Sequence, residues 1–380
     1  MSDRKKHVET SAIHGETDHK PDKKNRPVVP PLINSTVFYD TPDRDDDQYH
    51  YTRSANPNRD QLENVLCTLE GGAECAAFSS GMAASAAVFG MLEPGSHVIL
   101  PQDVYHGTRH YLKQILVPKG IQLSEADMTS ADSIRQSIRP ETRMIWIETP
   151  SNPMLHITDI EKVTSIADDH QVLTVVDNTW PTPVNLSPFD FGVDFIVHSA
   201  TKYLGGHSDI LAGAVIAREA NGHFEKIRNI QVSGGAVPSP FDCWLLVRSI
   251  KTLPARMRIH NDNGMQIAGF LSEHPSVEAV HYPGLSEHQG HDIATRQMKG
   301  FGGMISFQVK GDKKAARKVV FSSELIAQAT SLGGVESTWE HRRSSEGPES
   351  KTPENLIRLS VGIEHHLDLI RDIESSLCQL

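Results

Sequence analysis

The residue types that could do covalent chemistry lie at the ends of two apolar segments. Asp177 ends the first segment, and Lys202 follows the second, Phe195–His198. A buried carboxylate and a buried amine cost free energy unless each has a partner. They could pair with each other. They could also both pair with pyridoxal phosphate (PLP), whose aldehyde forms a Schiff base with lysine and whose ring nitrogen pairs with an acid. The two side chains therefore predict either a structural ion pair or a PLP site.

A phosphate-binding segment would favour the PLP site, and Ser79–Met82 has suitable residues. It lies between an apolar strand and a helix of small residues, so Gly81 and Met82 would begin that helix. A helix N-terminus offers free backbone N–H groups, and glycine lets a ligand approach closely. The same residues could form a plain capping turn. Ser199 and Thr201 could add hydroxyl donors. The sequence has no Walker loop, G-x-G-x-x-G or G-x-S-x-G motif, so the common nucleotide and serine-hydrolase functions lack support.

An aromatic residue, Tyr105, follows the predicted strand His97–Leu100 in a loop. In a parallel sheet, such loops lie at the carboxyl ends of the strands, where ligands bind. The tyrosine could stack on a cofactor ring there, or it could be an ordinary core residue. It is therefore a third candidate for a cofactor contact.

From about residue 59, apolar strand-like segments alternate with segments of helical periodicity, such as Met82–Met91 and Ile160–Asp169. Most of the strand-like segments are short continuous apolar runs, which is typical of strands covered on both faces. This alternation predicts an α/β fold with a mainly parallel sheet and helices on both sides. The predicted strands are Ala76–Phe78, His97–Leu100, Ile121–Ser124, Met144–Glu148, Leu173–Val176, Phe195–His198 and Ala212–Ala217.

Shifts in composition divide the chain into three regions. Residues 1–58 carry several prolines and an acidic cluster, and we expect an extended arm that lies on another surface, such as a neighbouring subunit. Residues 59–250 form the predicted large domain. Residues 251–380 form a smaller α+β domain. A long helical region at about Phe241–His274, interrupted at Pro254, leads into it. Its other predicted elements are strands at Val277–Tyr282, Met304–Val309, Ile326–Ala329 and Leu356–Val361 and helices at Lys313–Ser322 and Leu367–Leu377.

Composition argues against several classes of function. The 380 residues carry a formal net charge of −11, so the chain lacks the basic field of a nucleic-acid-binding protein. No apolar stretch has the length of a membrane span, and residues 1–26 lack the apolar core of a secretory signal, so we expect a cytoplasmic protein. The four cysteines have no paired spacing, and His106 and His110 have no third ligand nearby. We therefore expect free thiols and no metal site.

Nine short segments, in order and nearly from end to end, resemble the Cys/Met-metabolism family of PLP enzymes. This family includes cystathionine γ-synthases, cystathionine γ-lyases, cystathionine β-lyases and methionine γ-lyases. Each segment alone is unspecific, whereas the ordered set is very specific. The resemblance implies an aspartate-aminotransferase-like fold (fold type I), PLP as cofactor, and a homotetramer of two dimers that share active sites. The segments are Tyr51–Pro57, Leu69–Gly72, Ser80–Ala83, Glu148–Pro153, Asp177–Thr179, Ser199–Tyr203, Gly206–Asp209, Ser331–Ser337 and Ile357–Gly362.

The resemblance also implies roles for the matching residues. Lys202 would form the Schiff base and then shuttle protons, Asp177 would keep the ring nitrogen protonated, and Tyr105 would stack on the ring and assist proton transfer. Arg358 would clamp the α-carboxylate of an amino-acid substrate, because a guanidinium binds a carboxylate through two parallel hydrogen bonds. The remaining roles would fall to Gly81, Met82, Ser199 and Thr201 at the phosphate, Asn152 at the ring oxygen, Tyr51 and Arg53 at the phosphate of a neighbouring subunit, and Ser331, Glu336 and Asn152 at the substrate.

Departures from the family pattern bear on the substrate. His50 stands where related cystathionine enzymes often have an acidic or aromatic residue, which weakens the case for cystathionine. Gly107 stands where methionine γ-lyases have a cysteine, which argues against that activity. Glu336 favours a γ-synthase or γ-lyase over a β-lyase, although it could be a solvated side chain. Asn58 replaces a threonine, and we expect little effect. The charged segment Glu340–Arg343 could bind an anionic substrate, but a solvated loop is the simpler expectation.

We therefore expect a PLP-dependent carbon–sulfur lyase or γ-synthase that acts at Cγ of a sulfur amino acid or an activated homoserine. γ-Elimination and γ-replacement are equally favoured, because they use the same residues. A cystathionine β-lyase is the next alternative, and a γ-lyase for another γ-substituted amino acid also stays open. An aminotransferase is a remote alternative, since Tyr51–Arg53 and Ser331–Gly334 argue against it. We expect neither a nucleic-acid nor a membrane partner.

Overall fold

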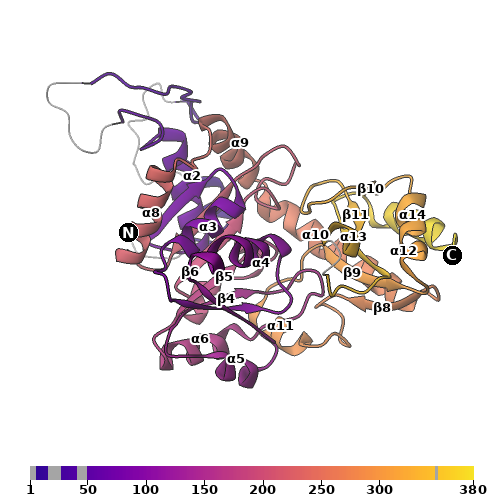
Figure 1. Cartoon of the computed structure of the whole chain (residues 1–380). Coiled ribbons are helices and arrows are strands. Elements are labelled where there is room, and N and C mark those ends of the chain that lie inside the picture. Colours follow the sequence, from indigo (N-terminus) through magenta and orange to yellow (C-terminus); the bar gives the residue numbers. More distant parts are fainter. Residues whose placement is uncertain (1–5, 16–26, 41–48, 347–349) are drawn as a thin grey trace.

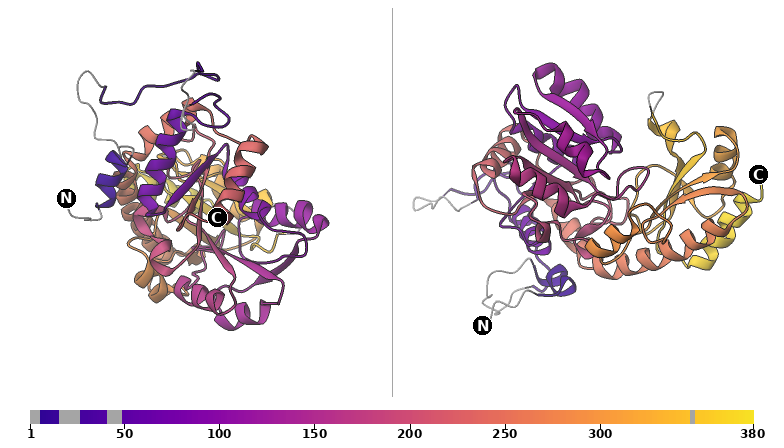
Figure 2. Two further views of the ribbon diagram at one scale, coloured as in Figure 1. Left: turned by 90° about the vertical axis from the view of Figure 1, so that its left-hand side faces the viewer. Right: turned by 90° about the horizontal axis from the view of Figure 1, so that it is seen from below.

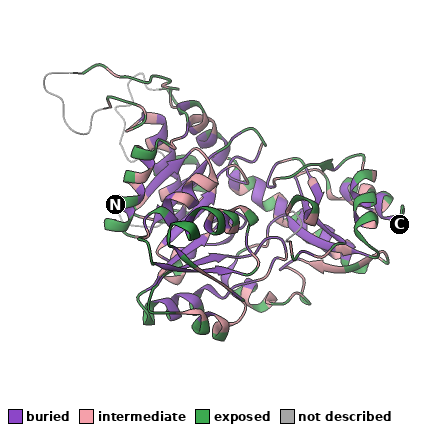
Figure 3. Cartoon of the chain, in the orientation of Figure 1, coloured by how far each residue is buried: buried purple, intermediate pink, exposed green. Residues whose placement is uncertain are grey.

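The chain folds around two β-sheets, each covered by helices (Figure 1). The computed structural model describes residues 6–15, 27–40, 49–346 and 350–380. A seven-stranded sheet holds strands β1 to β7, and a five-stranded sheet holds strands β8 to β12. Figure 3 shows that most of the strands are buried, whereas exposed residues gather on the outer faces of the helices and in the loops.

The seven-stranded sheet is mainly parallel, as the apolar runs predict. Strands β2 to β6 pair in parallel, and β7 runs antiparallel to both β6 and β1. The register places Glu148 beside Asp177, at the carboxyl ends of neighbouring strands. In order across the sheet, the strands are β1 (Glu74–Phe78), β7 (Gly213–Ala217), β6 (Phe195–Ser199), β5 (Leu173–Asp177), β4 (Thr142–Glu148), β2 (His97–Pro101) and β3 (Gln122–Ala126).

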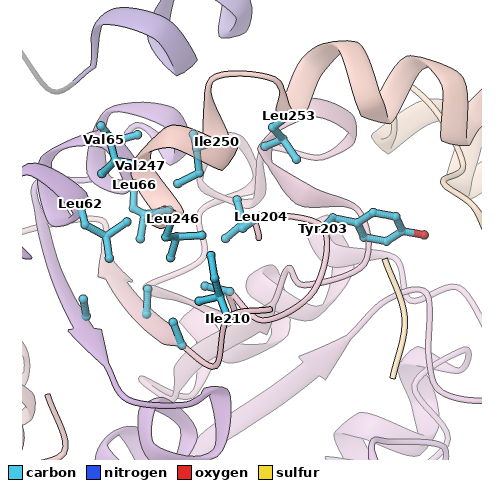
Figure 4. Close-up of a cluster of buried hydrophobic side chains, with 14 of the residues drawn as sticks. Leu62, Val65, Leu66, Tyr203, Leu204, Ile210, Leu246, Val247, Ile250 and Leu253 are labelled. Atoms are coloured by element: carbon cyan, nitrogen blue, oxygen red, sulfur yellow. The ribbon is translucent and has the colours of Figure 1, made fainter. Parts of the chain in front are cut away.

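Helices cover both faces of this sheet, which confirms the predicted layering. On one face, α3 (Gly81–Gly90) and α8 (Gly222–Gly234) pack on the strands. On the other face, Leu62, Val65 and Leu66 recur at helical spacing and give one helix an apolar side. Figure 4 shows these side chains packed against those of a second helix. The helices on that face are α2 (Pro57–Glu70), α5 (Ala131–Ser137), α6 (Ile160–Asp169) and α9 (Pro240–Ile250).

The five-stranded sheet contains a strand that the sequence did not predict. Strand β11 (Thr338–His341) pairs with β12 (Leu356–Ser360), where we expected a solvated loop. Glu340 and Arg342 are only 8% and 4% exposed. They form an ion pair with each other, and Glu340 also pairs with Arg358. The expectation of a solvated loop is therefore wrong. The remaining elements of this half are β8 (Val277–His281), β9 (Met304–Val309), β10 (Ala327–Gln328), α12 (Lys313–Ser322), α13 (Arg342–Glu346) and α14 (His366–Leu377).

Helix α10 (Leu253–Glu273) connects the two hydrophobic cores. Met257 packs in the core of the large sheet, and Ile267 packs in the core of the small sheet. Helix α9 ends before α10 begins, so Pro254 lies in the first turn of α10, where its missing N–H removes no helical hydrogen bond. The interruption thus precedes the proline. The other short helices are α4 (His106–Tyr111), α7 (Thr182–Asn185), α11 (His291–Gln297), η1 (Leu112–Leu116), η2 (Val117–Lys119) and η3 (Pro188–Phe191).

The N-terminal arm is not wholly extended. Helix α1 (Val8–His14) buries Ala12 in the core of the large sheet, and residues 27–40 are extended and stand away from both sheets (Figure 2). Asn58 fixes that extended segment, because its Oδ1 accepts from the N–H of Ile33 at 2.8 Å and its Nδ2 donates to the carbonyl of Pro31 at 2.9 Å. The expectation that Asn58 has little effect in place of a threonine stays a prediction. The acidic cluster at 43–47 lies outside the described residues.

Three general features bear on function. No helix in the described part of the chain is long and apolar enough to cross a membrane. Within those same residues, no group of three or more histidine, cysteine or acidic side chains could hold a metal ion. All four cysteines are free thiols.

Candidate active site

A cavity of about 270 Å³ lies at the carboxyl ends of the central parallel strands. Side chains from β12, from α13 and from the loop between β10 and β11 complete its wall, so both halves of the molecule contribute to one site. Three of the predicted residues, Tyr51, Arg53 and Glu336, are not part of this wall. The structure brings together the others, which are Gly81, Met82, Tyr105, Asn152, Asp177, Ser199, Thr201, Lys202, Ser331 and Arg358.

Asp177 is the last residue of β5 and ends inside the cavity wall. Its Oδ1 accepts a hydrogen bond from the backbone N–H of Thr179 at 3.1 Å. Burial raises the pKa of Asp177, and the hydrogen bonds from Thr179 and the charges of His198 and Lys202 oppose that rise. The carboxylate is thus a buried acid that is available to a positively charged group in the cavity.

Lys202 lies just after β6, and its Nζ donates to Ser331 Oγ at 2.6 Å. Both Lys202 and Asp177 are described, and no ion pair within 4.0 Å joins them, so the simple structural pair is not formed. Burial and the charges of Arg358 and Arg342 lower the pKa of Lys202 to about 8. Ser331 has a φ of +79°, a strained conformation for a residue with a side chain and one that concentrates at functional sites.

The N-terminus of α3 supplies the expected phosphate-binding features. Ser80 caps the helix by accepting from the N–H of Ala83 at 3.0 Å. As at any helix start, the first N–H groups have no intrahelical partners. A Cβ at Gly81 would lie 2.7 Å from the Cβ and 2.8 Å from the Cα of Ser199, so only glycine fits there. The hydroxyl of Thr201 donates to the carbonyl of Ala212 at 3.2 Å, so it would have to turn to reach a phosphate.

Glu148 is a site residue to which the sequence assigned no role. It lines the cavity beside Asp177, and its Oε2 accepts from the backbone N–H of Tyr105 at 3.0 Å. Burial, and then the charge of Asp177, raise the pKa of Glu148 well above its usual value. Burial therefore raises the pKa of both neighbouring acids, and the charge of Asp177 adds to the rise at Glu148. The sequence feature that could have identified Glu148 is its position at the end of an apolar strand.

Arg358 on β12 lines the cavity from the small-sheet half. Its Nη1 donates to Asn152 Oδ1 at 3.0 Å, and its Nη2 donates to Glu340 Oε1 at 2.5 Å and to the carbonyl of Ser331 at 3.3 Å. Burial and the neighbouring Arg342 lower the pKa of Arg358 to about 10, so the guanidinium stays charged at neutral pH. The sequence raised Arg342 only as part of the segment Glu340–Arg343, for which a solvated loop was the simpler expectation, and it assigned no role to Thr330.

The three predicted residues outside the wall lie on the surface of this chain. Glu336 is exposed, and it is Ser331 and Leu332 of the same segment that reach the cavity. Arg53 donates from Nη1 to the carbonyl of Val232 at 2.8 Å and lies over the ring of Tyr51 at 5.5 Å. Their expected contact with a neighbouring subunit stays a prediction.

The residues present fit PLP. A buried acid, an amine of lowered pKa and a glycine-bordered helix N-terminus lie in one cavity, and these match the ring nitrogen, aldehyde and phosphate of the cofactor. The fold and this site define a PLP-dependent enzyme with an aspartate-aminotransferase-like α/β architecture.

Comparison with known proteins identifies the family. Residues 9–378 match the family described as Cys/Met metabolism PLP-dependent enzyme, and the chain belongs to it. A cystathionine gamma-synthase of Mycobacterium tuberculosis is 41% identical over 97% of this chain and 96% of its own length. A cystathionine beta-lyase of Coxiella burnetii is 38% identical over 99% of each chain. The solved structure of cystathionine gamma-lyase from Lactobacillus plantarum complexed with L-serine has a TM-score of 0.92 and 36% identity, covering 98% of this chain and 99% of that one.

Proposed function

We propose that this enzyme catalyses γ-replacement: it joins an activated homoserine to the thiol of cysteine and forms cystathionine. The observation that carries this proposal is the convergence of Lys202, Asp177 and Arg358 on one cavity. The similarity to a cystathionine gamma-synthase over 97% of the chain favours replacement over elimination. γ-Elimination from cystathionine uses the same residues and is the second candidate, favoured by the likeness to a structure titled cystathionine gamma-lyase.

Each side chain of the cavity has its own role in this reaction. Arg358 binds the substrate α-carboxylate, and Asn152 and Ser331 hold its guanidinium in place. Lys202, with a pKa of about 8, can be a free amine near neutral pH and take a proton first from Cα and then from Cβ. PLP, when bound, supplies an electron sink for the charge left at Cα, and Asp177 keeps that sink protonated. Tyr105 is a candidate to assist these proton transfers.

The bond changes balance without a further reactant. The Cγ–O bond of the homoserine ester breaks, and its acid leaves as a carboxylate or phosphate. The sulfur of cysteine forms a bond to Cγ and releases its proton. The two protons removed from Cα and Cβ return to the product. No oxidant or reductant is required.

Product identification tests this proposal. The PLP-loaded protein is mixed with an acylated homoserine and cysteine, and separately with L-cystathionine alone. Cystathionine from the first mixture supports γ-replacement, whereas 2-oxobutanoate and cysteine from the second establish γ-elimination as the principal activity. Pyruvate and homocysteine from the second mixture would overturn chemistry at Cγ in favour of a cystathionine β-lyase, the name of the Coxiella burnetii relative.

We also propose a homotetramer in which the arm of residues 1–58 contributes Tyr51 and Arg53 to a neighbour's phosphate site. The exposure of several apolar side chains on this arm supports the proposal, because such side chains gain free energy when a second surface covers them. They include Val28, Leu32, Val37, Tyr39 and Tyr51.

A further inference from the structure

A buried pair of an acid and a histidine lies on the face of the large sheet that is opposite the cavity. Val197 and Ser199 of β6 line the cavity, whereas His198 between them points to the other face, because successive side chains of a strand alternate. On that face, His198 Nε2 forms a hydrogen bond of 2.5 Å to Oε1 of Glu70, the last residue of α2. Both side chains are only 1% exposed, and neither has a part in the proposed reaction.

The carboxylate of Glu70 connects two strands where they end at the cavity. Its Oε1 also accepts a hydrogen bond from Asn178 Nδ2 at 2.9 Å. Asn178 directly follows Asp177, the last residue of β5. On the next strand, His198 directly precedes Ser199, the last residue of β6. One buried oxygen therefore binds the two residues that adjoin the ring-nitrogen acid and the serine of the phosphate site.

The pair needs a positive charge. A carboxylate this deeply buried is costly unless a cation or a proton compensates it, and among the residues that the structure describes its ion-pair partner is His198. An imidazolium at His198 would supply that charge. Three polar atoms of the cluster are buried without a hydrogen-bond partner in the described part of the chain, namely His198 Nδ1, Glu70 Oε2 and Asn178 Oδ1. A network that only held the strands together would be expected to satisfy these atoms.

Asp177 is the group that a positive charge at His198 would stabilise. It pairs in register with Val197, the residue before His198, and Glu148 places a second acid beside it. Burial raises the pKa of Asp177, and the charge of His198 is one of the causes that oppose the rise. Only an ionised Asp177 can keep a ring nitrogen protonated, so the carboxylate needs this support.

We propose that Glu70 and His198 are positioning residues that act from the far face of the sheet: they keep Asp177 ionised and thereby keep the ring nitrogen of bound PLP protonated. Glu70 stabilises the imidazolium of His198, and the imidazolium stabilises the carboxylate of Asp177. Neither Glu70 nor His198 lines the cavity, so both act through Asp177. The inference rests on the placement of the ring nitrogen at Asp177, and it holds for γ-replacement and γ-elimination alike.

Nitrogen NMR tests the proposal on protein loaded with PLP that carries ¹⁵N in its ring, because the ¹⁵N shift separates a protonated from an unprotonated ring. Asp177→Asn gives the reference shift of the unprotonated ring. In Glu70→Gln, which keeps the size of the side chain, the resonance should move from the wild-type position toward that reference. The dissociation constant for PLP, measured with cofactor-free protein, should rise about tenfold, the equivalent of one pKa unit at Asp177.

Glu63→Gln is the matched control. Glu63 is a buried carboxylate on the same helix, and its Oε1 accepts from the backbone N–H of Ala77 on β1 at 2.7 Å. Its loss should lower the stability of the fold and leave the ring resonance at the wild-type position. Should Glu70→Gln fail to fold, His198→Gln decides. A glutamine can donate to Glu70 but cannot carry a positive charge, so the resonance should again move toward the unprotonated ring.

The contrary results are distinct. An unchanged resonance in Glu70→Gln, or in His198→Gln where that variant replaces it, would give the pair only a structural role and overturn the inference. A displacement just as large in Glu63→Gln would do the same. An unchanged resonance in Asp177→Asn would instead overturn the placement of the ring nitrogen, and the inference with it.

Discussion

At the scale of single residues, the lowered pKa of Lys202 sets how much of its side chain is a free amine. An exposed lysine is almost wholly protonated at neutral pH, whereas a pKa of about 8 leaves roughly a tenth of the Lys202 side chains as free amine at pH 7. The cause is local: burial disfavours the ammonium, and two guanidinium groups repel it. Ser331 holds the amine without neutralising it.

We expect the pH dependence of cofactor capture to report this pKa. The rate at which cofactor-free protein recombines with PLP should rise about tenfold per pH unit and level off above pH 8, because only the unprotonated amine attacks an aldehyde. In Arg358→Met the inflection should move to higher pH, since one repelling charge is gone. Stopped-flow absorbance between pH 6 and pH 10 measures both. An inflection near the ordinary lysine value of 10.5 in the wild type would contradict this account.

At the scale of elements, strand pairing assembles the site. The register of β11 with β12 sets Glu340 opposite Arg358, and the register of β4 with β5 sets Glu148 beside Asp177. The strands of the large sheet could be predicted, because continuous apolar runs mark strands buried on both faces. Strand β11 could not, because Glu340 resembles a surface residue until its partner, 18 residues further along the chain, is placed beside it.

Removing the shared carboxylate should destabilise the small-sheet half. Glu340→Gln leaves Arg342 and Arg358 buried with a weaker partner, so the free energy of unfolding in urea should fall by about 3 kcal/mol. Burial raises the pKa of Glu340, but Arg358 and Arg342 outweigh it and the net shift is downward. The stabilisation is therefore present above the ordinary value of 4.5 and is lost as the pH falls through the lowered pKa.

Two comparisons check that prediction. Glu336→Gln removes an exposed carboxylate four residues away and should change the free energy of unfolding by no more than about 0.5 kcal/mol. The difference between wild type and Glu340→Gln should shrink below pH 4.5. A difference that stays constant down to pH 3 would show that the charge of Glu340 is not what stabilises this pair of strands.

At the scale of the whole molecule, the arm of residues 1–58 leaves large apolar side chains exposed. Val28 is 96% exposed and Tyr39 is 100% exposed, although α1 of the same arm is packed against the large sheet. The prolines predicted an extended segment, and Asn58 fixes its course. A neighbouring subunit that would cover it, as in the proposed homotetramer, could not be placed from the sequence of one chain.

Subunit mixing tests the shared site. If Arg53 serves a neighbour, Arg53→Ala and Lys202→Ala should each be impaired. When the two variants are unfolded and refolded together, about a quarter of the sites should combine an intact Lys202 with a neighbour's intact Arg53, and activity should rise accordingly. The control mixture combines Lys202→Ala with Arg343→Met, which removes an arginine that is not part of the cavity wall. Activity no higher than the average of the separate variants would place Arg53 outside the neighbour's site.

The central claim is that this PLP enzyme works at Cγ through proton removal from both Cα and Cβ. Turnover of a homoserine ester with cysteine in D₂O tests it most directly, with the product analysed by NMR and mass spectrometry. We predict cystathionine that carries deuterium at both Cα and Cβ of its homoserine-derived half, and no product from Lys202→Ala. Deuterium at Cα alone, or a product formed without cysteine incorporation, would contradict the claim.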